Sequence, residues 1–339
     1  MKTSDFDYFL PPECIAQTPI EPRHNSRLLL IKRDSDDFQD EIFHNLGQYL
    51  RAGDLLVINQ TRVIPARLFA RKPTGGKVEL LLLKRIEADS WEALVGGKGL
   101  KPGVMVTVEN GPEVEIVGDR EGSRRRIRFM SPIDNLLPNV GQMPLPPYIH
   151  TPLGNPERYQ TVFSKETGSA AAPTAGLHFT PELMNQLEAK GIQFARVTLH
   201  VGLDTFAPVT EDDPEEHKIH SEWCEVTPET AQAINVAKER GGRVIAVGTT
   251  SVRTLESAAA KSAQPGRVAA ISGPTQLFIL PGYEFKVVDA IITNFHLPKS
   301  SLIMLISAFV GREKILKAYE TAIQRGYRFY SFGDAMLIL

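Results

Sequence analysis

Hydrophobic runs separated by polar turns divide the chain into three parts. In the first part, apolar runs at 26–32 and 54–59 indicate buried strands. Between them, Ile42, Leu46 and Leu50 recur at helical spacing, which predicts a helix over 41–50. A strand, a helix and a second strand in this order are typical of an α/β layer.

The middle part, from Val63 to about Met130, contains only strand signals and turns. Asn110-Gly111, between two such runs, is a strong hairpin signal. Short strands with close turns and no helix indicate a small β-barrel or sandwich. The strands predicted here cover 67–71, 77–83, 91–95, 104–108, 113–117 and 124–130.

The α/β pattern returns after a stiff, proline-rich linker at 144–149. We therefore expect a discontinuous α/β domain, open and barrel-like, made of 1–62 and 148–339, with an all-β barrel domain inserted at 63–147. Helices are predicted to follow Asn155, to fill 181–190, to run from Thr227 to Gly241 and up to Ala260, and to fill 301–310 and 314–325. Strands are predicted at 192–201, 243–247, 276–280, 287–293, 328–331 and 335–339.

Composition narrows the class of protein. The chain has 339 residues, 42% hydrophobic and 23% charged, which is an ordinary globular balance. Its net charge of −2 is not that of a protein that coats nucleic acid, so any RNA contact must come from a local patch. Cys14 and Cys224 suggest neither a disulfide framework nor a zinc knuckle. The polar N-terminus resembles no signal peptide, and 301–310 is too short to cross a bilayer, so we expect a soluble cytoplasmic protein.

A stretch of small residues at 168–180 stands out, because it carries almost no bulk before Leu177. Small side chains allow a close approach of the backbone to a ligand or to another segment. Thr180 is a good N-cap for the helix that follows, so His178 is expected just before a helix N-terminus. A ligand-binding loop and a tight structural turn explain this stretch equally well.

Gly248-Thr249-Thr250-Ser251 lies between a predicted strand and a predicted helix. A helix N-terminus with adjacent hydroxyls can hold a carboxylate or phosphate, and Arg253 in the same helix can add a bidentate contact. Ordinary N-capping explains the same residues, and the pattern matches neither a Walker loop nor a dinucleotide fingerprint.

Histidines provide the candidates for proton transfer. His217, His220 and Glu222 fail the spacing of known zinc motifs, and strand alternation places His220 and Glu222 on one face with His217 on the other. This favours an acid–base pair, although a solvated loop is the ordinary alternative. His200 and His296 each follow a predicted strand, where a hydrogen-bonded structural histidine is common and a shared cleft is the alternative.

Several long strings identify a family resemblance. They are Arg158-Tyr159-Gln160-Thr161-Val162-Phe163, 168–180, 197–206, His217-x-x-His220-x-Glu222, 247–257, 293–297 and 327–338. With these strings the sequence closely resembles the S-adenosylmethionine:tRNA ribosyltransferase-isomerases of queuosine biosynthesis, from Asp5 to the C-terminus. It departs from the family pattern at Asp204, where glycine is usual, and at Ser301, where threonine is usual.

The resemblance implies a reaction and its partners. Such enzymes take the ribosyl part of S-adenosylmethionine and attach it to 7-aminomethyl-7-deazaguanine at the wobble position of tRNA. They rearrange it to give epoxyqueuosine, and adenine and methionine leave. The resemblance also implies an α/β domain with an inserted β-barrel. S-adenosylmethionine is then a cosubstrate, and we expect no prosthetic group, metal, membrane or obligatory protein partner.

The same resemblance and the chemistry assign provisional roles to residues. The reaction needs a base for the carbon beside the sulfonium and an acid for departing adenine. The candidates for proton transfer are His200, His217, His220, Glu222, His178 and His296. Phe179 is expected to stack on adenine, and Arg253 with Thr249 and Thr250 to hold the methionine carboxylate. The residues expected to contact tRNA phosphates are Arg62, Arg67, Arg71, Lys72, Arg124, Arg125 and Arg126. For the arginines of 124–128, a solvated strand edge is the commoner interpretation.

Three other classes of protein remain open at this point. A non-catalytic tRNA-binding or chaperone protein would release no adenine. An ordinary methyltransferase would leave S-adenosylhomocysteine and would normally show a glycine-rich loop after its first strand, which the sequence lacks. A metallohydrolase built on His217, His220 and Glu222 would lose activity in excess chelator.

Overall fold

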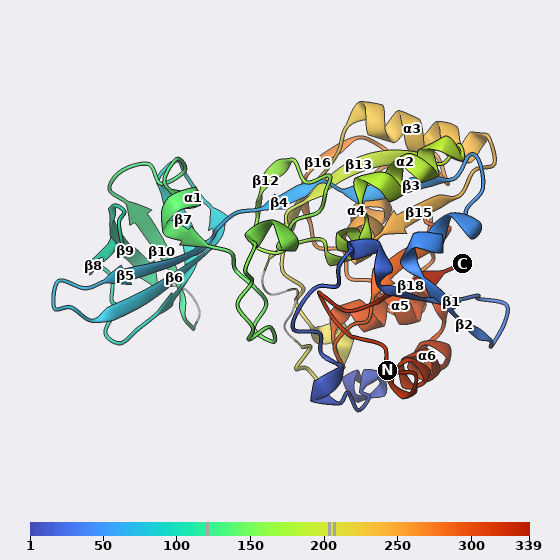
Figure 1. The fold of residues 1–339 in the computed structure, drawn as a ribbon. Helices are drawn as coiled ribbons and strands as arrows, with labels where there is room; N and C mark the ends of the chain where they lie inside the picture. The colour runs from blue at the N-terminus through green and yellow to red at the C-terminus, as the bar shows by residue number, and fades with distance from the viewer. Residues whose placement is uncertain (120–121, 203–204, 206–207) are drawn as a thin grey trace. The chain divides into compact units, whose positions relative to one another are not determined.

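The computed structural model describes residues 1–119, 122–202, 205 and 208–339, and within it the chain forms two units (Figure 1). The α/β unit comprises Met1–Thr61, Pro147–Glu166 and Pro173–Leu339. The barrel unit comprises Arg62–Pro146 and Thr167–Ala172, and this second segment is one that the sequence pattern does not indicate. The expected combination of an α/β fold with an inserted β-barrel is confirmed.

A nine-stranded sheet forms the centre of the α/β unit. Its strands are β1 (Arg27–Ile31), β2 (Phe38–Ile42), β3 (Leu55–Asn59), β13 (Gln193–Leu199), β14 (Glu222–Val226), β15 (Val244–Val247), β16 (Ile271–Thr275), β17 (Ala290–Asn294) and β18 (Ala335–Ile338). Their order across the sheet is β16-β14-β13-β3-β15-β17-β18-β1-β2. The four strands β13, β3, β15 and β17 run parallel, whereas β14, β16, β18 and β2 join through antiparallel pairs.

The central strands of this sheet are apolar on both sides, so both faces must be buried, and helices cover each of them. On one face, Leu56 and Ile58 pack in one core with the 3-10 helices η4 (Phe43–Gln48) and η6 (Thr174–His178) and with α2 (Pro181–Ala189). On the other face, Leu55 and Val57 pack in a second core with α3 (Pro228–Glu239), α4 (Thr249–Ala260), α5 (Ser301–Val310) and α6 (Arg312–Gln324). None of the helices in the described part of the chain combines the length and apolar character needed to cross a membrane.

Local sequence signals explain most helix boundaries. Thr180 caps α2 by accepting a hydrogen bond from the Leu183 N–H, and Thr227 caps α3 in the same way. Further 3-10 helices in the described part of the chain are η1 (Thr3–Phe6), η2 (Pro12–Cys14), η3 (Arg23–Asn25), η5 (Pro156–Tyr159) and η8 (Pro214–Glu216). In η5, Asn155 is the cap, as expected.

Three predicted elements are wrong. The helix over 41–50 is replaced by the end of β2 and by η4, whose Phe43 and Leu46 follow the tighter three-residue spacing of a 3-10 helix. No strand forms at 276–280, where the Leu277 carbonyl accepts from Arg253 Nε at 3.0 Å; the edge strand is β16 instead. The strand at 328–331 is reduced to a single bridge at Phe329, because Tyr330 has a φ of 69°, which is incompatible with an extended chain.

The barrel unit is an antiparallel sheet whose first and last long strands pair. Its elements are β5 (Arg67–Arg71), β6 (Lys77–Arg85), β7 (Ser90–Gly96), β8 (Met105–Val108), β9 (Glu113–Asp119), β10 (Arg124–Phe129), α1 (Leu137–Val140) and β11 (Gly141–Gln142). The order is β11-β5-β6-β7-β10-β9-β8, and an additional β5–β8 pairing closes the barrel. The predicted hairpin at Asn110, which has a φ of 58°, connects β8 to β9. Two short strands, β4 (Thr61–Val63) and β12 (Glu166–Ser169), form a separate sheet.

Candidate active site

The carboxyl ends of β3, β13 and β15 meet at one edge of the central sheet. After β15 the chain enters α4 on one face, whereas the chain that returns after β3 passes through η6 and α2 on the other face. Neighbouring parallel strands whose connections diverge in this way leave a crevice at their carboxyl ends, where α/β proteins bind ligands. The residues at this edge are therefore the first candidates for a site.

The N-terminus of α4 lies directly at this edge. Gly248 has a φ of 87°, which lets β15 turn into the helix without an intervening loop. Thr249 and Thr250 then open α4, where backbone N–H groups favour an anion. The hydroxyls of Ser251 and Thr254 instead bond to carbonyls four residues earlier, at 2.8 and 2.9 Å. The geometry therefore leaves Thr249 and Thr250 as the residues suited to a ligand.

Asn59, at the end of β3, was missed as a site residue by the sequence analysis. Its Nδ2 donates to the Leu199 carbonyl at 2.9 Å and lies 3.3 Å from Thr250 Oγ1. Its Oδ1 accepts the N–H groups of Leu199 and Thr61, both at 3.1 Å. The Asn59 side chain therefore connects the ends of β3 and β13 to the start of α4 through hydrogen bonds. The only signal in the sequence is an amide at the end of an apolar run.

Glu222 and Arg253 form a buried ion pair, and only 3% and 5% of their surfaces are exposed. Glu222 Oε1 also accepts the Gly202 N–H at 2.9 Å and the Thr205 hydroxyl at 3.0 Å. Burial by itself raises the pKa of Glu222, but the hydrogen bond from His220 and the charge of Arg253 outweigh it and lower the pKa to about 2. Glu222 is therefore a fixed carboxylate. Asp204, in the neighbouring segment, lies outside the described residues.

His220 is held by this carboxylate. Its Nε2 lies 3.3 Å from Glu222 Oε1 and 3.3 Å from Thr205 Oγ1, so the expected placement of His220 and Glu222 on one face agrees with the geometry. Because an ionised carboxylate only accepts, His220 carries its proton on Nε2 and leaves the lone pair on Nδ1. The imidazole is partly exposed, so Nδ1 is suited to accept a proton from a ligand.

His217 lies in a different environment. Its Nδ1 lies 2.8 Å from Glu211 Oε2, and its ring packs edge-on against Phe278 at 5.7 Å. Within the described ranges, no group of three or more His, Cys, Asp or Glu side chains is placed to hold a metal ion.

His200 lies on the opposite face of the sheet from Glu222. The pairing of Thr198 with Glu225 puts His200 beside Trp223, and their rings stack with centroids 5.3 Å apart. The His200 Nδ1 lies 2.7 Å from the Thr61 hydroxyl, and burial lowers the pKa of this imidazole. The structure therefore separates His200 from His220, because successive residues of a strand face opposite sides.

His178 and His296 are buried and have hydrogen-bond partners. His178 Nδ1 is 2.7 Å from the Ser26 hydroxyl and its Nε2 is 3.2 Å from the Asn294 amide. His296 Nε2 is 3.0 Å from the Thr293 hydroxyl. Burial lowers the pKa of each to about 3, assisted at His178 by nearby arginines. Both are neutral groups that help to hold the end of β17 in place, and their expected part in proton transfer stays a prediction.

The Phe179 side chain is packed inside the core of the α/β unit. Its ring has no exposed surface and lies 5.1 Å from Phe43 and 6.3 Å from both Phe163 and Phe194. Burying this apolar ring in the core contributes more to the stability of the fold than leaving it exposed at the surface. Phe179 therefore has a packing role, and the ring would have to leave the core to stack on adenine, which stays a prediction.

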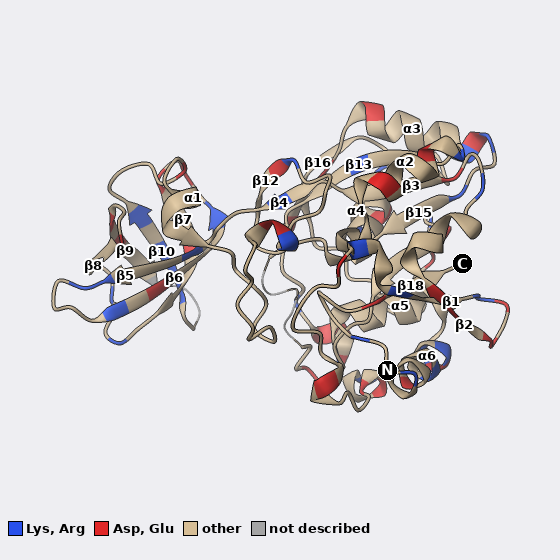
Figure 2. Cartoon of the chain, in the orientation of Figure 1, with Lys and Arg blue, Asp and Glu red and all other residues tan. Residues whose placement is uncertain are grey.

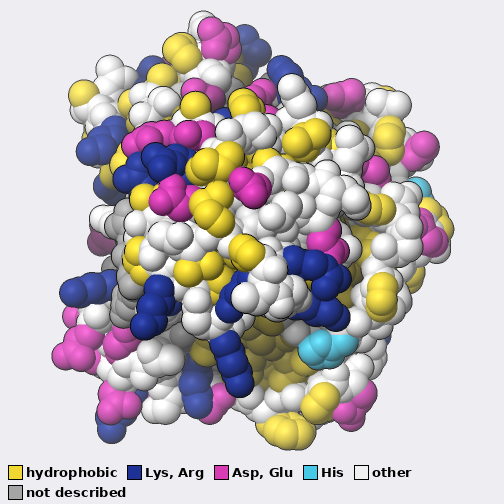
Figure 3. Space-filling view, turned by 90° about the vertical axis from the view of Figure 1, so that its left-hand side faces the viewer, with side chains coloured by type: hydrophobic (Ala, Val, Ile, Leu, Met, Phe, Trp, Pro, Cys, Tyr) yellow, Lys and Arg dark blue, Asp and Glu magenta, His cyan; other side chains and the backbone are white. Residues whose placement is uncertain are grey.

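Most basic residues expected to contact RNA form ion pairs with carboxylates of the barrel unit. In Figure 2, both blue and red segments occur in this unit. The pairs are Arg67–Glu79 at 3.1 Å, Arg71–Glu109 at 3.0 Å, Arg124–Glu92 at 2.7 Å and Arg126–Glu87 at 2.8 Å. Lys72 donates to the Lys98 carbonyl and Arg125 to that of Gly122, and Arg62 in β4 is half-buried. Positive and negative side chains are likewise intermixed on the face in Figure 3.

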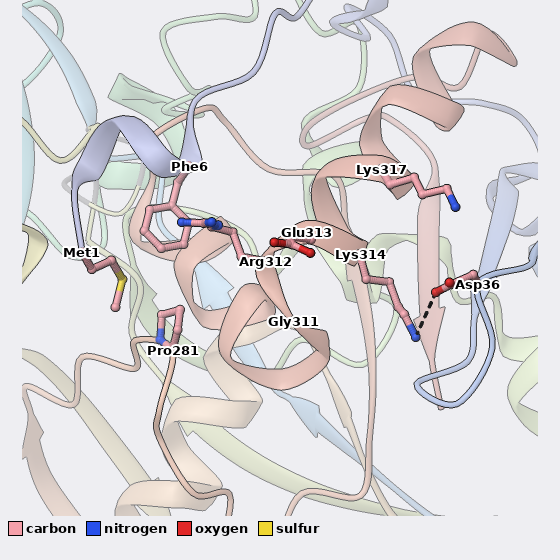
Figure 4. Close-up of a pocket in the computed structure, with 9 residues that line it drawn as sticks. All are labelled: Met1, Phe6, Asp36, Pro281, Gly311, Arg312, Glu313, Lys314 and Lys317. Carbon is pink, nitrogen blue, oxygen red and sulfur yellow. Dashed lines mark ion pairs between the residues drawn. The ribbon is translucent and has the colours of Figure 1, made fainter.

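A pocket of about 600 Å³ lies elsewhere in the α/β unit, between η1 and the start of α6 (Figure 4). Its basic side chains include Lys314, 3.6 Å from Asp36, and Arg312, 3.4 Å from Asp5. None of the residues singled out by sequence lines it. We therefore do not assign the site there.

A parallel α/β sheet with an inserted barrel, and with a carboxylate-held histidine beside a helix N-terminus at its strand ends, defines the class as an α/β enzyme of acid–base type. Comparison with known proteins identifies the family. The chain matches the family model described as queuosine biosynthesis protein over residues 3–338. The chain therefore belongs to this family, as its sequence strings predict.

Relatives with assigned names agree over their whole lengths. The chain is 55% identical to the S-adenosylmethionine:tRNA ribosyltransferase-isomerase of Symbiobacterium thermophilum and 54% identical to that of Carboxydothermus hydrogenoformans, with 100% of each chain covered. The crystal structure of S-adenosylmethionine tRNA ribosyltransferase from Thermotoga maritima is 41% identical, covers 99% of this chain and 100% of its own, and has a TM-score of 0.58.

Proposed function

We propose that this enzyme transfers and isomerises the ribosyl moiety of S-adenosylmethionine onto 7-aminomethyl-7-deazaguanine in the anticodon of tRNA, giving epoxyqueuosine, adenine and methionine. Family membership over the whole chain supports this reaction. Within the fold, the observation that carries it is His220, oriented by the buried Glu222–Arg253 pair. The enzyme works in the cytoplasm on this proposal.

The chemistry requires proton transfer and no enzyme nucleophile. The sulfonium acidifies the neighbouring carbon and leaves as neutral methionine, keeping the electrons of the broken carbon–sulfur bond. Two protons are lost, one from that carbon and one from the attacking amine; one ends on adenine and the other reaches solvent. His220 Nδ1 is proposed to accept the proton from the carbon beside the sulfonium, and Glu222 keeps the imidazole in the tautomer that this step requires.

The donor is proposed to bind with its methionine carboxylate at the N-terminus of α4. Thr249 and Thr250 supply backbone N–H groups and hydroxyls there. Arg253 supports this assignment, because its Nη1 is committed to Glu222 while its buried Nη2 has no hydrogen-bond partner among the described residues. A bound anion or an ordered water at this nitrogen would satisfy it. None of these steps draws on a metal.

The experiment that tests the function uses donor labelled in its ribose and tRNA carrying the modified base. We expect label in the tRNA and release of one adenine per ribosyl group, with activity retained in excess chelator. Donor labelled in its methyl group is the matched control and should leave the tRNA unlabelled. Methyl label in the tRNA, or donor consumption without adenine, would contradict the proposal.

The tRNA is proposed to contact the barrel through the residues Arg62, Arg67, Arg71, Lys72, Arg124, Arg125 and Arg126. Arg67, Arg71, Arg124 and Arg126 pair with carboxylates that are themselves partly exposed, so a phosphate can replace those partners. The affinity for an anticodon stem-loop should fall as the salt concentration rises. Replacing Arg71 and Lys72 together by Gln should reduce the slope of log affinity against log salt concentration by about 1 to 2. An affinity independent of salt would exclude phosphate contacts.

A further inference from the structure

A second pocket in the α/β unit gathers segments that are distant in the sequence. Arg23 and Arg158 line it together with His178 and Ser331, and Ile20 and Phe332 form part of its apolar rim. Three of the strings that identify the family therefore meet here, those at 158–163, 168–180 and 327–338. None of the roles assigned above uses this pocket.

Reciprocal hydrogen bonds fix the arginines at this pocket. Arg23 donates from Nη1 to the Gln160 carbonyl at 2.5 Å and from Nη2 to the Glu157 carbonyl at 2.8 Å. Arg158 donates in return to the Ile20 carbonyl at 2.8 Å. Arg328, from the third segment, donates to the Thr18 carbonyl at 3.2 Å. Backbone carbonyls orient the guanidinium groups but carry no charge that would neutralise them.

Positive side chains gather here, and the nearest carboxylates are Glu21 and Glu157 beside Arg23 and Asp334 beside Arg328. Arg158 pairs with Glu21 at 2.5 Å, but the Glu21 side chain is 66% exposed. Arg23 and Arg328 make no ion pair in the described part of the chain, and the buried Nε of Arg328 has no hydrogen-bond partner there. Burial and then the charge of Arg158 lower the pKa of Arg23 to about 10. A buried guanidinium N–H without a partner, such as the Nε of Arg328, would be satisfied by an anion that accepts a hydrogen bond from it.

Resting on the proposed function, we propose that Arg23, Arg158 and Arg328 form an anion-binding site that takes a single oxyanion group from a substrate. The fork of a guanidinium group suits both a phosphodiester and a carboxylate. A phosphodiester of the tRNA is the occupant expected, because the N-terminus of α4 is already assigned to the carboxylate of the donor. Either source has the same chemistry, and binding experiments separate them.

The test measures two affinities separately, one for an anticodon stem-loop over a range of salt and one for S-adenosylmethionine. In R23Q and R328Q, we expect RNA affinity to fall at least about fivefold and the salt slope to decrease by about 0.7 for each lost contact, with donor affinity unchanged. R325Q is the matched control, because Arg325 also donates to a backbone carbonyl and pairs with a carboxylate, Asp40, away from the pocket.

A structural role alone would lower the melting temperature without changing the salt slope. The R23K variant covers the case in which R23Q does not fold, because lysine retains the positive charge but lacks the guanidinium fork. For R23K we expect weaker RNA binding, with a salt dependence of the affinity close to that of the unmodified protein. A loss of donor affinity alone would support the anion site with the carboxylate as its occupant. Unchanged affinities for both substrates would overturn the proposal. Failure of the proposed reaction is distinguishable, because it removes turnover while these binding differences persist.

Discussion

At the residue scale, the partner of each histidine decides what its ring can do. A buried carboxylate faces His220, a hydroxyl and an amide hold His178, and a stacked indole covers one side of His200. The sequence places these histidines at strand ends or in loops, and only the fold shows which partners they have. His217 and His220 both face a carboxylate and are partly exposed, but only the partner of His220 is buried and paired with an arginine. Strand alternation predicts the His220–Glu222 pair, because that pattern is local.

Replacing His220 by Ala should reduce turnover at least about 100-fold, because the proposed base is lost. Donor affinity, measured by calorimetry, should change little. His217→Ala is the matched control and should retain activity, since His217 is held by Glu211 instead. Full turnover by the His220 variant would remove it from the mechanism.

The buried histidines make the protein sensitive to acid. The folded pKa of His178 is lowered to about 3 from 6.5, so between these values the unfolded chain binds a proton that the folded chain does not. Stability should therefore fall as pH drops from 6.5 toward 3, by up to about 1.4 kcal/mol per pH unit for each such group. His296 acts in the same direction, and Glu222 adds a further loss below pH 4.5.

Denaturant melts at several pH values test this dependence. His178→Gln, which keeps hydrogen-bonding groups but does not titrate, should show a shallower fall in stability between pH 6.5 and 4. The exposed His44, replaced in the same way, is the control and should leave the profile unchanged. Parallel profiles for His178→Gln and the unmodified protein would contradict the assignment.

At the element scale, caps and turns were the most predictable features. Thr180, Thr227 and Asn110 act through hydrogen bonds or dihedral preferences within a few residues, so the sequence contains the whole interaction. Elements that depend on distant partners were not predictable. β16 forms at the edge because β14 offers it a pairing surface, although its sequence contains Gly273 and Pro274, whereas the more apolar segment at 276–280 forms no strand.

Gly248 is the element-scale position on which the proposed donor site depends most. An alanine Cβ would meet only Thr250 Oγ1 at 3.5 Å and Ala175 Cβ at 3.6 Å, so the penalty comes from the φ of 87°. Gly248→Ala should lower stability by about 1 to 2 kcal/mol and weaken donor binding, since the start of α4 must shift. Gly154→Ala, in open space at an ordinary φ, is the control for thermal melting and calorimetry. An unchanged affinity for S-adenosylmethionine would show that the donor does not bind at the N-terminus of α4.

At the scale of the whole molecule, the two units have separate hydrophobic cores. Leu80, Ile116 and Ile127 are fully buried in the barrel, whereas two further clusters lie on the faces of the nine-stranded sheet. Separate cores permit unfolding in more than one step.

Leu80→Ala should therefore lower the transition of the barrel by about 2 to 5 kcal/mol and leave that of the α/β unit nearly unchanged. Leu56→Ala, equally buried in the sheet, is the matched variant and should affect the other transition. Scanning calorimetry with fluorescence of the barrel residue Trp91 distinguishes the two. A single transition that shifts equally in both variants would show that the units unfold together.

The sequence by itself determined the family, the α/β pattern with its inserted barrel, the main helix caps and the pairing of His220 with Glu222. These follow from long shared strings and from interactions within a few residues. Only the tertiary structure decided that Phe179 is core, that His178 and His296 are neutral, that most of the barrel arginines have carboxylate partners, and that Arg23 and Arg158 line one pocket. Burial and charge neutralisation depend on side chains contributed by distant segments, and no local pattern specifies which segments those are.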